Sequence, residues 1–280
     1  MNVAVVTDST AYLPEGMAAE HAIGVVPLQV VLGSRTGDEG VDVQPDDVAA
    51  ALHERRSAVT TSRPSPERFV EAYLAAGVAS IVSVHLSGQL SGTVDAARTA
   101  AAEVASRGID VHVVDSGSVA MGLGFAVIAA AEAASAGRSV TEVEGAAVAA
   151  AAGTSTYFYV DTLEHLRRGG RIGAAAALFG TALSVKPLLR VVDGMIAPLE
   201  KVRTVSKALA RLEKLVIERA GDRPVDIAVH HLAAPGRAND MADRLRAQVP
   251  GLRQLFLSEV GAVVGAHVGP GLLGVVVADR

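Results

Sequence analysis

Hydroxyl side chains gather in two segments that each precede a predicted helix. One segment reads HLSGQLSGT at 85–93 and follows a predicted strand, and the other reads TTSRPSP at 60–66. Hydroxyl groups and the exposed N–H groups of a helix N-terminus can together hold an oxyanion. Serine and threonine at such places also cap helices and shape turns, so the spacing alone leaves both roles open.

Arginine and glycine combine in another candidate site, RRGGRIG at 167–173. A guanidinium group binds carboxylate or phosphate through two parallel hydrogen bonds, and glycine lets a ligand approach the backbone closely. The first two arginines also fit the end of a solvated helix, so Arg171 is the stronger candidate for anion binding. His267 begins HVGPG at 267–271, a predicted turn where an imidazole can donate to an anion, although a single histidine is more often structural.

Two aspartates stand at the ends of predicted strands, Asp8 and Asp115. Carboxylates at such places could bind a metal ion, but no histidine or acidic cluster of ligand spacing accompanies them. Helix capping or structural hydrogen bonding is the favoured interpretation. We expect neither a metal nor a cofactor.

The composition excludes several classes of protein. The chain has 280 residues, no cysteine, 3% aromatic residues and a formal net charge of −5. Without cysteine it has no disulfide, thiolate metal site or cysteine nucleophile, and few rings with net negative charge disfavour nucleic-acid binding. The sequence also lacks the G-x-S-x-G motif of serine hydrolases and the G-x-x-x-x-G-K-[ST] and strand-following G-x-G-x-x-G loops of nucleotide-binding proteins.

The first half of the chain alternates short β-branched runs with alanine-rich segments of helix length. This pattern is typical of βα units that form a parallel sheet. The predicted strands are Val3–Val6, Val25–Val31, Ser80–His85 and Val111–Val114. The predicted helices are Pro14–His21, Pro45–Arg56, Pro66–Ala76, Val94–Arg107 and Val119–Ala136. We therefore expect an N-terminal α/β domain at 1–153 with a mainly parallel, doubly wound sheet.

The second half of the chain has a different order of strand and helix segments, which predicts a mixed sheet. Asp193-Gly194 between two apolar runs is a strong hairpin signal, which favours antiparallel pairing. The alanine-rich segment Glu144–Ala152 precedes this half, and helices are predicted at Val205–Arg219 and Ala238–Gln248. The predicted strands are Ser155–Val160, Leu188–Val192, Met195–Val202, Ile227–His230, Gln254–Leu257 and Leu273–Val277. We expect a C-terminal mixed α/β domain at 154–280.

The longest apolar stretch runs from Val119 to Ala136. It is mostly alanine and glycine and contains Glu132, so it is interpreted as a buried helix rather than a membrane span. The first ten residues, MNVAVVTDST, do not resemble a signal peptide. A cytoplasmic location is expected.

Taken together, these segments resemble the DegV family of bacterial fatty-acid-binding proteins over essentially the whole chain. Each motif alone is weak, but their common order is specific. The motifs are VTDSTAYLP at 6–14, TSRPSP at 61–66, LSGQLSGT at 86–93, VDSGSVAMGLG at 114–124, LRRGGRIG at 166–173, KPLL with DGMI at 186–196, and HVGPG at 267–271.

The resemblance implies two α/β domains with a fatty acid in a tunnel between them. It implies that the carboxylate is held by the hydroxyls of Thr61, Ser62 and Ser91, with Arg171 and His267 near the head group. It also implies a lipid-binding carrier without catalytic residues of its own. A separate ATP-binding fatty acid kinase subunit would phosphorylate the bound acid, and an enzyme that accepts the acyl phosphate would be a further partner.

The apolar segment Gly173–Leu189 offers small and branched side chains that suit such a tunnel, although packing in a helix core is the favoured interpretation for any single residue. The candidates are Ala174–Ala177, Leu178, Phe179, Leu183 and Leu188. Two positions, Gln89 and Arg63, depart from the common family pattern. These side chains add bulk and charge near the expected head group.

Two other functions stay open from the residues. One is an enzyme that acts directly on a small carboxylated or phosphorylated metabolite, with Arg171 stabilising charge and His267 acting as an acid. The other is a lipid-sensing regulator, which would differ only in its partner.

Overall fold

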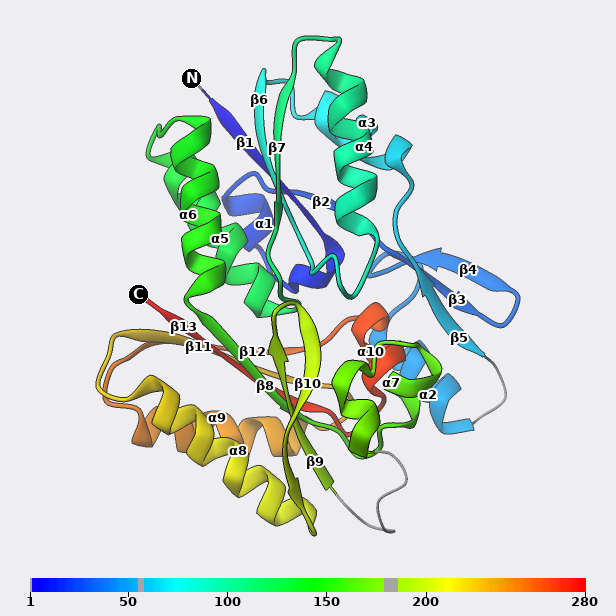
Figure 1. Cartoon of the computed structure of the whole chain (residues 1–280), viewed down its shortest axis with the longest axis vertical. Helices are drawn as coiled ribbons and strands as arrows, with labels where there is room; N and C mark the ends of the chain where they lie inside the picture. Colours follow the sequence, from blue (N-terminus) through cyan, green and yellow to red (C-terminus); the bar gives the residue numbers. More distant parts are fainter. Residues whose placement is uncertain (1, 55–57, 179–185) are drawn as a thin grey trace. The chain divides into compact units, whose positions relative to one another are not determined.

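A computed structural model describes residues 2–54, 58–178 and 186–280 of the chain (Figure 1). The chain divides into two compact units. The first unit contains residues 1–29 and 62–153, and the second contains residues 30–61 and 154–280. The two units are described separately below.

The first unit contains a four-stranded sheet in the order β2-β1-β6-β7. All three strand pairs are parallel. The strands are β1 (Val3–Asp8), β2 (Gly24–Val26), β6 (Ser80–His85) and β7 (Asp110–Asp115). In the register of β1 and β6, Thr7 pairs with Val84, so Asp8 and His85 end neighbouring strands at one edge of the sheet. The predicted parallel sheet is therefore confirmed.

Helices cover both faces of this sheet (Figure 1). Helices α3 and α4 bury Phe69, Tyr73 and Ala97 against Ile81 of the sheet. Helices α5 and α6 pack on the other face, against β1, β6 and β7. The helical elements of the unit are η1 (Ser9–Ala11), α1 (Met17–Glu20), α3 (Pro66–Ala75), α4 (Thr93–Ala105), α5 (Met121–Ser135) and α6 (Val140–Ala152).

The most apolar stretch of the sequence forms α5, which is buried along most of its length. A helix that is apolar on all sides is expected in a protein interior. Among the described helices, none combines the length and the apolar character needed to cross a membrane.

The second unit contains a six-stranded mixed sheet in the order β10-β9-β8-β13-β11-β12. The pair β11–β12 is parallel and the other pairs are antiparallel. The strands are β8 (Thr154–Tyr159), β9 (Lys186–Val192), β10 (Met195–Val202), β11 (Val225–His231), β12 (Leu252–Glu259) and β13 (Leu273–Asp279). Asp193 and Gly194 both have positive φ between β9 and β10, which confirms the predicted hairpin turn.

Two long helices, α8 (Val205–Ala220) and α9 (Pro235–Gln248), pack on this mixed sheet. Leu212 of α8 and Met241 of α9 are fully buried in one cluster with alternate residues of the strands, among them Ile227 and Val275. The helical spacing of the apolar residues and the two-residue period of the strands therefore meet in a single core.

Segment 30–61 belongs with the second unit, whereas the predicted N-terminal domain at 1–153 included it. The predicted strand Val25–Val31 is in fact two strands, because Pro27 lacks the N–H that a sheet interior requires. After it, β3 (Gln29–Leu32), β4 (Arg35–Asp38) and β5 (Val59–Ser62) form a separate sheet in the order β4-β3-β5.

Segment 30–61 is attached to the second unit through helix α10 (Ala262–Val268). Helix α2 (Pro45–Glu54) packs on α10. The buried Glu39 side chain accepts a hydrogen bond of 2.7 Å from the Val263 N–H in the first turn of α10. A carboxylate at this place also satisfies a donor that the helix itself leaves unpaired.

Several short elements were not predicted from the sequence. Thr61 and Ser62 were expected in a turn but lie in strand β5. His267 was expected in a Gly/Pro turn but lies in the last turn of α10. Helix α7 (Glu164–Arg168) and the 3-10 helix η2 (Gly173–Leu178) complete the second unit.

Candidate functional site

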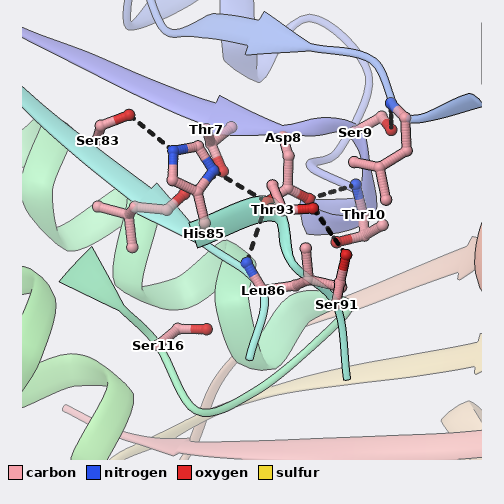
Figure 2. Close-up of polar contacts among 12 residues, drawn as sticks. Thr7, Asp8, Ser9, Thr10, Ser83, His85, Leu86, Ser91, Thr93 and Ser116 are labelled. Atoms are coloured by element: carbon pink, nitrogen blue, oxygen red, sulfur yellow. Dashed lines mark hydrogen bonds and ion pairs between the residues drawn. The ribbon is translucent and has the colours of Figure 1, made fainter. Parts of the chain in front are cut away.

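The carboxyl edge of the first sheet holds a buried network of polar groups centred on Asp8 (Figure 2). Its Oδ1 accepts hydrogen bonds from the N–H of Thr10 at 3.0 Å and the hydroxyl of Thr10 at 2.5 Å. Its Oδ2 lies 3.0 Å from both the Leu86 N–H and His85 Nδ1. The prediction that Asp8 makes structural hydrogen bonds is therefore confirmed.

The network continues from His85 into the interior of the unit. His85 Nε2 lies 2.7 Å from the Ser83 hydroxyl, which accepts a hydrogen bond of 2.9 Å from the Tyr73 hydroxyl. The His85 ring also stands edge-on to Phe69, with 5.0 Å between the ring centroids. Burial raises the pKa of Tyr73, so this group stays a neutral donor.

The order Ser83, His85, Asp8 matches the serine-histidine-carboxylate order of hydrolases. All three side chains are completely inaccessible to solvent, and Ser83 is already bonded to Tyr73. No substrate can reach the Ser83 hydroxyl in this arrangement. These residues therefore form structural hydrogen bonds and do not serve as a nucleophilic triad.

Ser91 lies in the loop that follows β6. Its hydroxyl is half-buried and lies 2.8 Å from the Thr93 hydroxyl. Helix α4 begins at Thr93 with Gly92 as its N-cap, so neither hydroxyl occupies the capping position. The capping interpretation, which the sequence left open, does not describe Ser91.

Ser62 and Arg63 also lie in the first unit, where Arg63 packs on the Ser91 loop. Ser62 is exposed, and its hydroxyl donates to Gln29 Oε1 at 3.4 Å. Arg63 donates to the Gly92 carbonyl at 3.4 Å, and a Cβ on Gly92 would lie 3.0 Å from the Arg63 Cδ. The departure from the family pattern at Arg63 therefore places a cation beside the loop that carries Ser91.

In the second unit, Thr61 and His267 form a hydrogen-bonded pair. The distance between Thr61 Oγ1 and His267 Nε2 is 2.8 Å. Burial and, secondarily, the nearby charge of Arg171 lower the pKa of His267 to about 4, so the imidazole is neutral at pH 7. The other ring nitrogen, Nδ1, is buried and has no hydrogen-bond partner within the described part of the chain.

Two glycines provide the space for the histidine rings of this region. A Cβ on Gly169 would lie 2.1 Å from His267 Nδ1, and one on Gly269 would lie 2.2 Å from His165 Cδ2. Arg171 donates to the Gly169 carbonyl at 2.7 Å. Gly169 of the RRGGRIG motif and Gly269 of the HVGPG motif thus leave room for the histidine rings. The sequence showed only that glycine is frequent in these two segments.

The five predicted site residues fall into two groups. Thr61, Arg171 and His267 belong to the second unit, and Ser62 and Ser91 belong to the first. The sequence did not predict the roles of Tyr73, Ser83 or His85; the positions of Asp8 and His85 at two strand ends were the available signal.

The residues predicted to line a tunnel in 173–189 differ in their burial, and the tunnel itself stays a prediction. Leu188 is fully buried in the hydrophobic core that includes residues of α8, as the alternative of core packing expects. Ala175 is also buried, whereas Ala174, Ala176 and Ala177 are exposed. Phe179, Leu183 and the side chain of Leu178 lie outside what the structure describes.

Comparison with known proteins places this geometry in a family. The family model described as "Uncharacterised protein, DegV family" matches residues 2–280. A DegV domain-containing protein of Streptomyces coelicolor is 61% identical over 282 residues, which cover 100% of this chain and 99% of the relative.

Solved structures are similar over the whole chain. A Thermus thermophilus DegV family protein described by its fatty acid binding has a TM-score of 0.94 at 31% identity, with 100% of both chains covered. Bacillus subtilis DegV, described as a fatty acid binding protein, has a TM-score of 0.90 at 34% identity, also with 100% of both chains covered. From its sequence and its fold, the chain belongs to the DegV family.

Proposed function

We propose that this protein binds a long-chain fatty acid. The carboxylate of the fatty acid is bound by the hydroxyls of Thr61, Ser62 and Ser91, with Arg171 and His267 close to this head group. The observation that carries this proposal is the Thr61–His267 hydrogen bond beside a guanidinium group, in a chain whose relatives of solved structure bind fatty acids.

The proton positions in the Thr61–His267 pair support an anionic ligand. Because Nδ1 of the neutral ring is buried and has no partner among the described residues, we assign the proton to Nε2, since buried N–H groups without a partner are rarer than such acceptors. Nε2 then donates to Thr61 Oγ1, which leaves the Thr61 hydroxyl proton to donate elsewhere. A carboxylate is the natural acceptor for it.

Arg171 adds the charge that a carboxylate requires. A guanidinium group is always positively charged, and its planar shape matches a carboxylate that accepts two parallel hydrogen bonds. A hydrocarbon chain supplies the rest of the affinity, because each buried CH₂ contributes about 0.8 kcal/mol. No aromatic stacking is needed, which suits a chain with 3% aromatic residues.

We further propose that the protein is a cytoplasmic carrier that presents the bound acid to a separate ATP-dependent kinase subunit, which forms the acyl phosphate. The absence of phosphate-binding loops from the sequence supports a division of labour in which ATP binds to the partner. The carrier then contributes binding and orientation and no catalytic residue.

Binding is tested with oleate and methyl oleate. Thr61→Ala should weaken oleate binding by about ten-fold and methyl oleate binding much less, because only the acid loses a charge-assisted hydrogen bond. Thr60→Ala is the matched control, since Thr60 is the exposed neighbour on the opposite face of the same strand. Equal losses for acid and ester would contradict the role of Thr61.

Two further measurements test the carrier and its partner. Native mass spectrometry of the purified protein should show a copurifying fatty acid, and a protein that neither carries one nor binds oleate would end the proposal. Acyl phosphate should form from ATP only when a kinase subunit is added. Turnover of a small carboxylated metabolite by the protein alone would instead favour a direct enzyme.

A further inference from the structure

Asp8 joins two loops at the carboxyl edge of the first sheet. Through Oδ1 it fixes Thr10 in the turn after β1, and through Oδ2 it fixes the Leu86 N–H at the start of the loop after β6 (Figure 2). The second of these loops carries Ser91. The inference developed here rests on the proposed fatty-acid site and concerns what orients that hydroxyl.

The Ser91 loop is held by backbone hydrogen bonds and by the Asp115 carboxylate, which accepts from the Gly88 N–H at 3.1 and 3.2 Å. The Ser87 N–H donates to the Ser118 carbonyl at 2.8 Å, and the N–H groups of Leu90 and Ser91 both donate to the Ser87 carbonyl, at 3.0 and 3.1 Å. The position of Ser91 therefore depends on where residues 86–88 are held. Asp8 is the side chain that binds the first of them.

The buried network assigns the proton of His85. Tyr73 donates to the Ser83 oxygen, so the single Ser83 proton is available for His85 Nε2. His85 then carries its proton on Nδ1 and donates it to Asp8 Oδ2. With the protons placed in this way, every side-chain donor in this chain of four residues has an acceptor.

We propose that Asp8 and His85 are positioning residues for the carboxylate site. In this arrangement the His85 Nδ1–H bond fixes the Asp8 carboxylate in the orientation that holds the Leu86 N–H. The loop from 86 to 91 then presents the Ser91 hydroxyl to the head group. The pair touches no ligand, because both side chains are completely buried.

Two substitutions of His85 separate this role from simple packing. In His85→Asn, the amide nitrogen occupies the place of Nδ1 and can still donate to Asp8. In His85→Gln, the amide reaches the place of Nε2 and can bond to Ser83, but the donor to Asp8 is lost. Both variants lose the ring that packs on Phe69, so they form a matched pair.

The readout is the ratio of oleate affinity to methyl oleate affinity, measured by isothermal titration. His85→Gln should lower this ratio by about ten-fold, and His85→Asn should retain it within about three-fold. Equal ratios in the two variants would overturn the proposal, because a merely structural role affects them alike. A wild-type protein that binds neither ligand would instead refute the proposed function, so the two failures are distinguishable.

A measurement on the wild-type protein covers the case in which either variant does not fold. The ¹⁵N chemical shifts of the His85 ring, identified by comparison with Ser83→Ala, report which nitrogen carries the proton. We expect a protonated Nδ1 and an unprotonated Nε2, as the hydrogen bonds to Asp8 and Ser83 require. A proton on Nε2 alone would remove the bond to Asp8 and overturn the proposal.

Discussion

Replacement of Gly169 by alanine should separate ligand binding from stability. Gly169 ends helix α7 with φ −74° and ψ −8°, a conformation that alanine adopts without strain. The added Cβ would nevertheless lie 2.1 Å from His267 Nδ1 and 2.8 Å from Cε1. Since nonbonded carbon atoms pack at about 3.5–4.0 Å, the imidazole must move by at least about 1 Å.

That displacement breaks the 2.8 Å contact between His267 Nε2 and Thr61 Oγ1. Loss of the hydrogen bond lowers the free energy of unfolding by about 1 kcal/mol, whereas replacement of a glycine by alanine at a helix end raises it by up to about 1 kcal/mol. Stability should therefore change little. Oleate affinity should fall by about ten-fold or more, because Thr61 is no longer oriented by His267.

The assay combines urea denaturation with titration of oleate and methyl oleate. Gly236→Ala is the control, because Gly236 lies in helix α9 of the same unit and a Cβ there meets nothing within 4 Å. This control should bind oleate like the wild type. An alanine variant at Gly169 with unchanged oleate affinity would refute the reasoning that His267 orients Thr61.

Three further predictions concern stability. Glu39→Gln should lower the free energy of unfolding by about 1–2 kcal/mol in urea denaturation, because the Val263 N–H loses an ionised acceptor at the start of α10; an unchanged midpoint would contradict this. Hydrogen bonding to Glu144 raises the pKa of the partly exposed His112, so the stability it contributes is present below about pH 6.5 and lost as the pH rises through its folded pKa. His112→Gln should therefore destabilise the protein more at pH 5.5 than at pH 8.5, and equal losses at the two pH values would argue against the charged pair. Burial lowers the pKa of His230 to about 4. Below about pH 6.5 the unfolded chain therefore binds a proton at this residue and the folded protein does not, so the free energy of unfolding falls by on the order of 3 kcal/mol towards pH 4. His230→Asn should flatten this acid dependence in urea denaturation at pH 7.0 and pH 4.5, and an unaltered slope would show that other groups cause it.

The sequence by itself determined most of the longer helices and strands and the type of the two larger sheets. The β-branched run Ser80–His85 forms the predicted strand, the segment Val205–Arg219 forms the predicted helix, and Asp193-Gly194 forms the predicted turn. Such signals are local, because side-chain period and turn geometry involve residues close together in the chain. The ordered motifs also identified the family, although the individual roles of their glycines were not apparent.

The assignment of segment 30–61 to the second unit came only from the tertiary structure. Pro27 gave a local sign that a strand would be interrupted, but the partner of Glu39 lies at Val263, 224 residues away. No local pattern encodes which of two hydrophobic cores a short sheet will join. That choice depends on the packing of α2 against α10.

For the candidate site too, the sequence determined some features and the tertiary structure determined others. Its residue types could be read from the sequence, because hydroxyls, an arginine and a histidine stand in glycine-rich segments. The contact between Thr61 and His267 spans 206 residues, and the path from Tyr73 to Asp8 crosses a helix and two strands. Side-chain chemistry is a property of each residue, but burial, protonation and hydrogen-bond partners depend on the fold that brings distant residues together, and only the tertiary structure decided them.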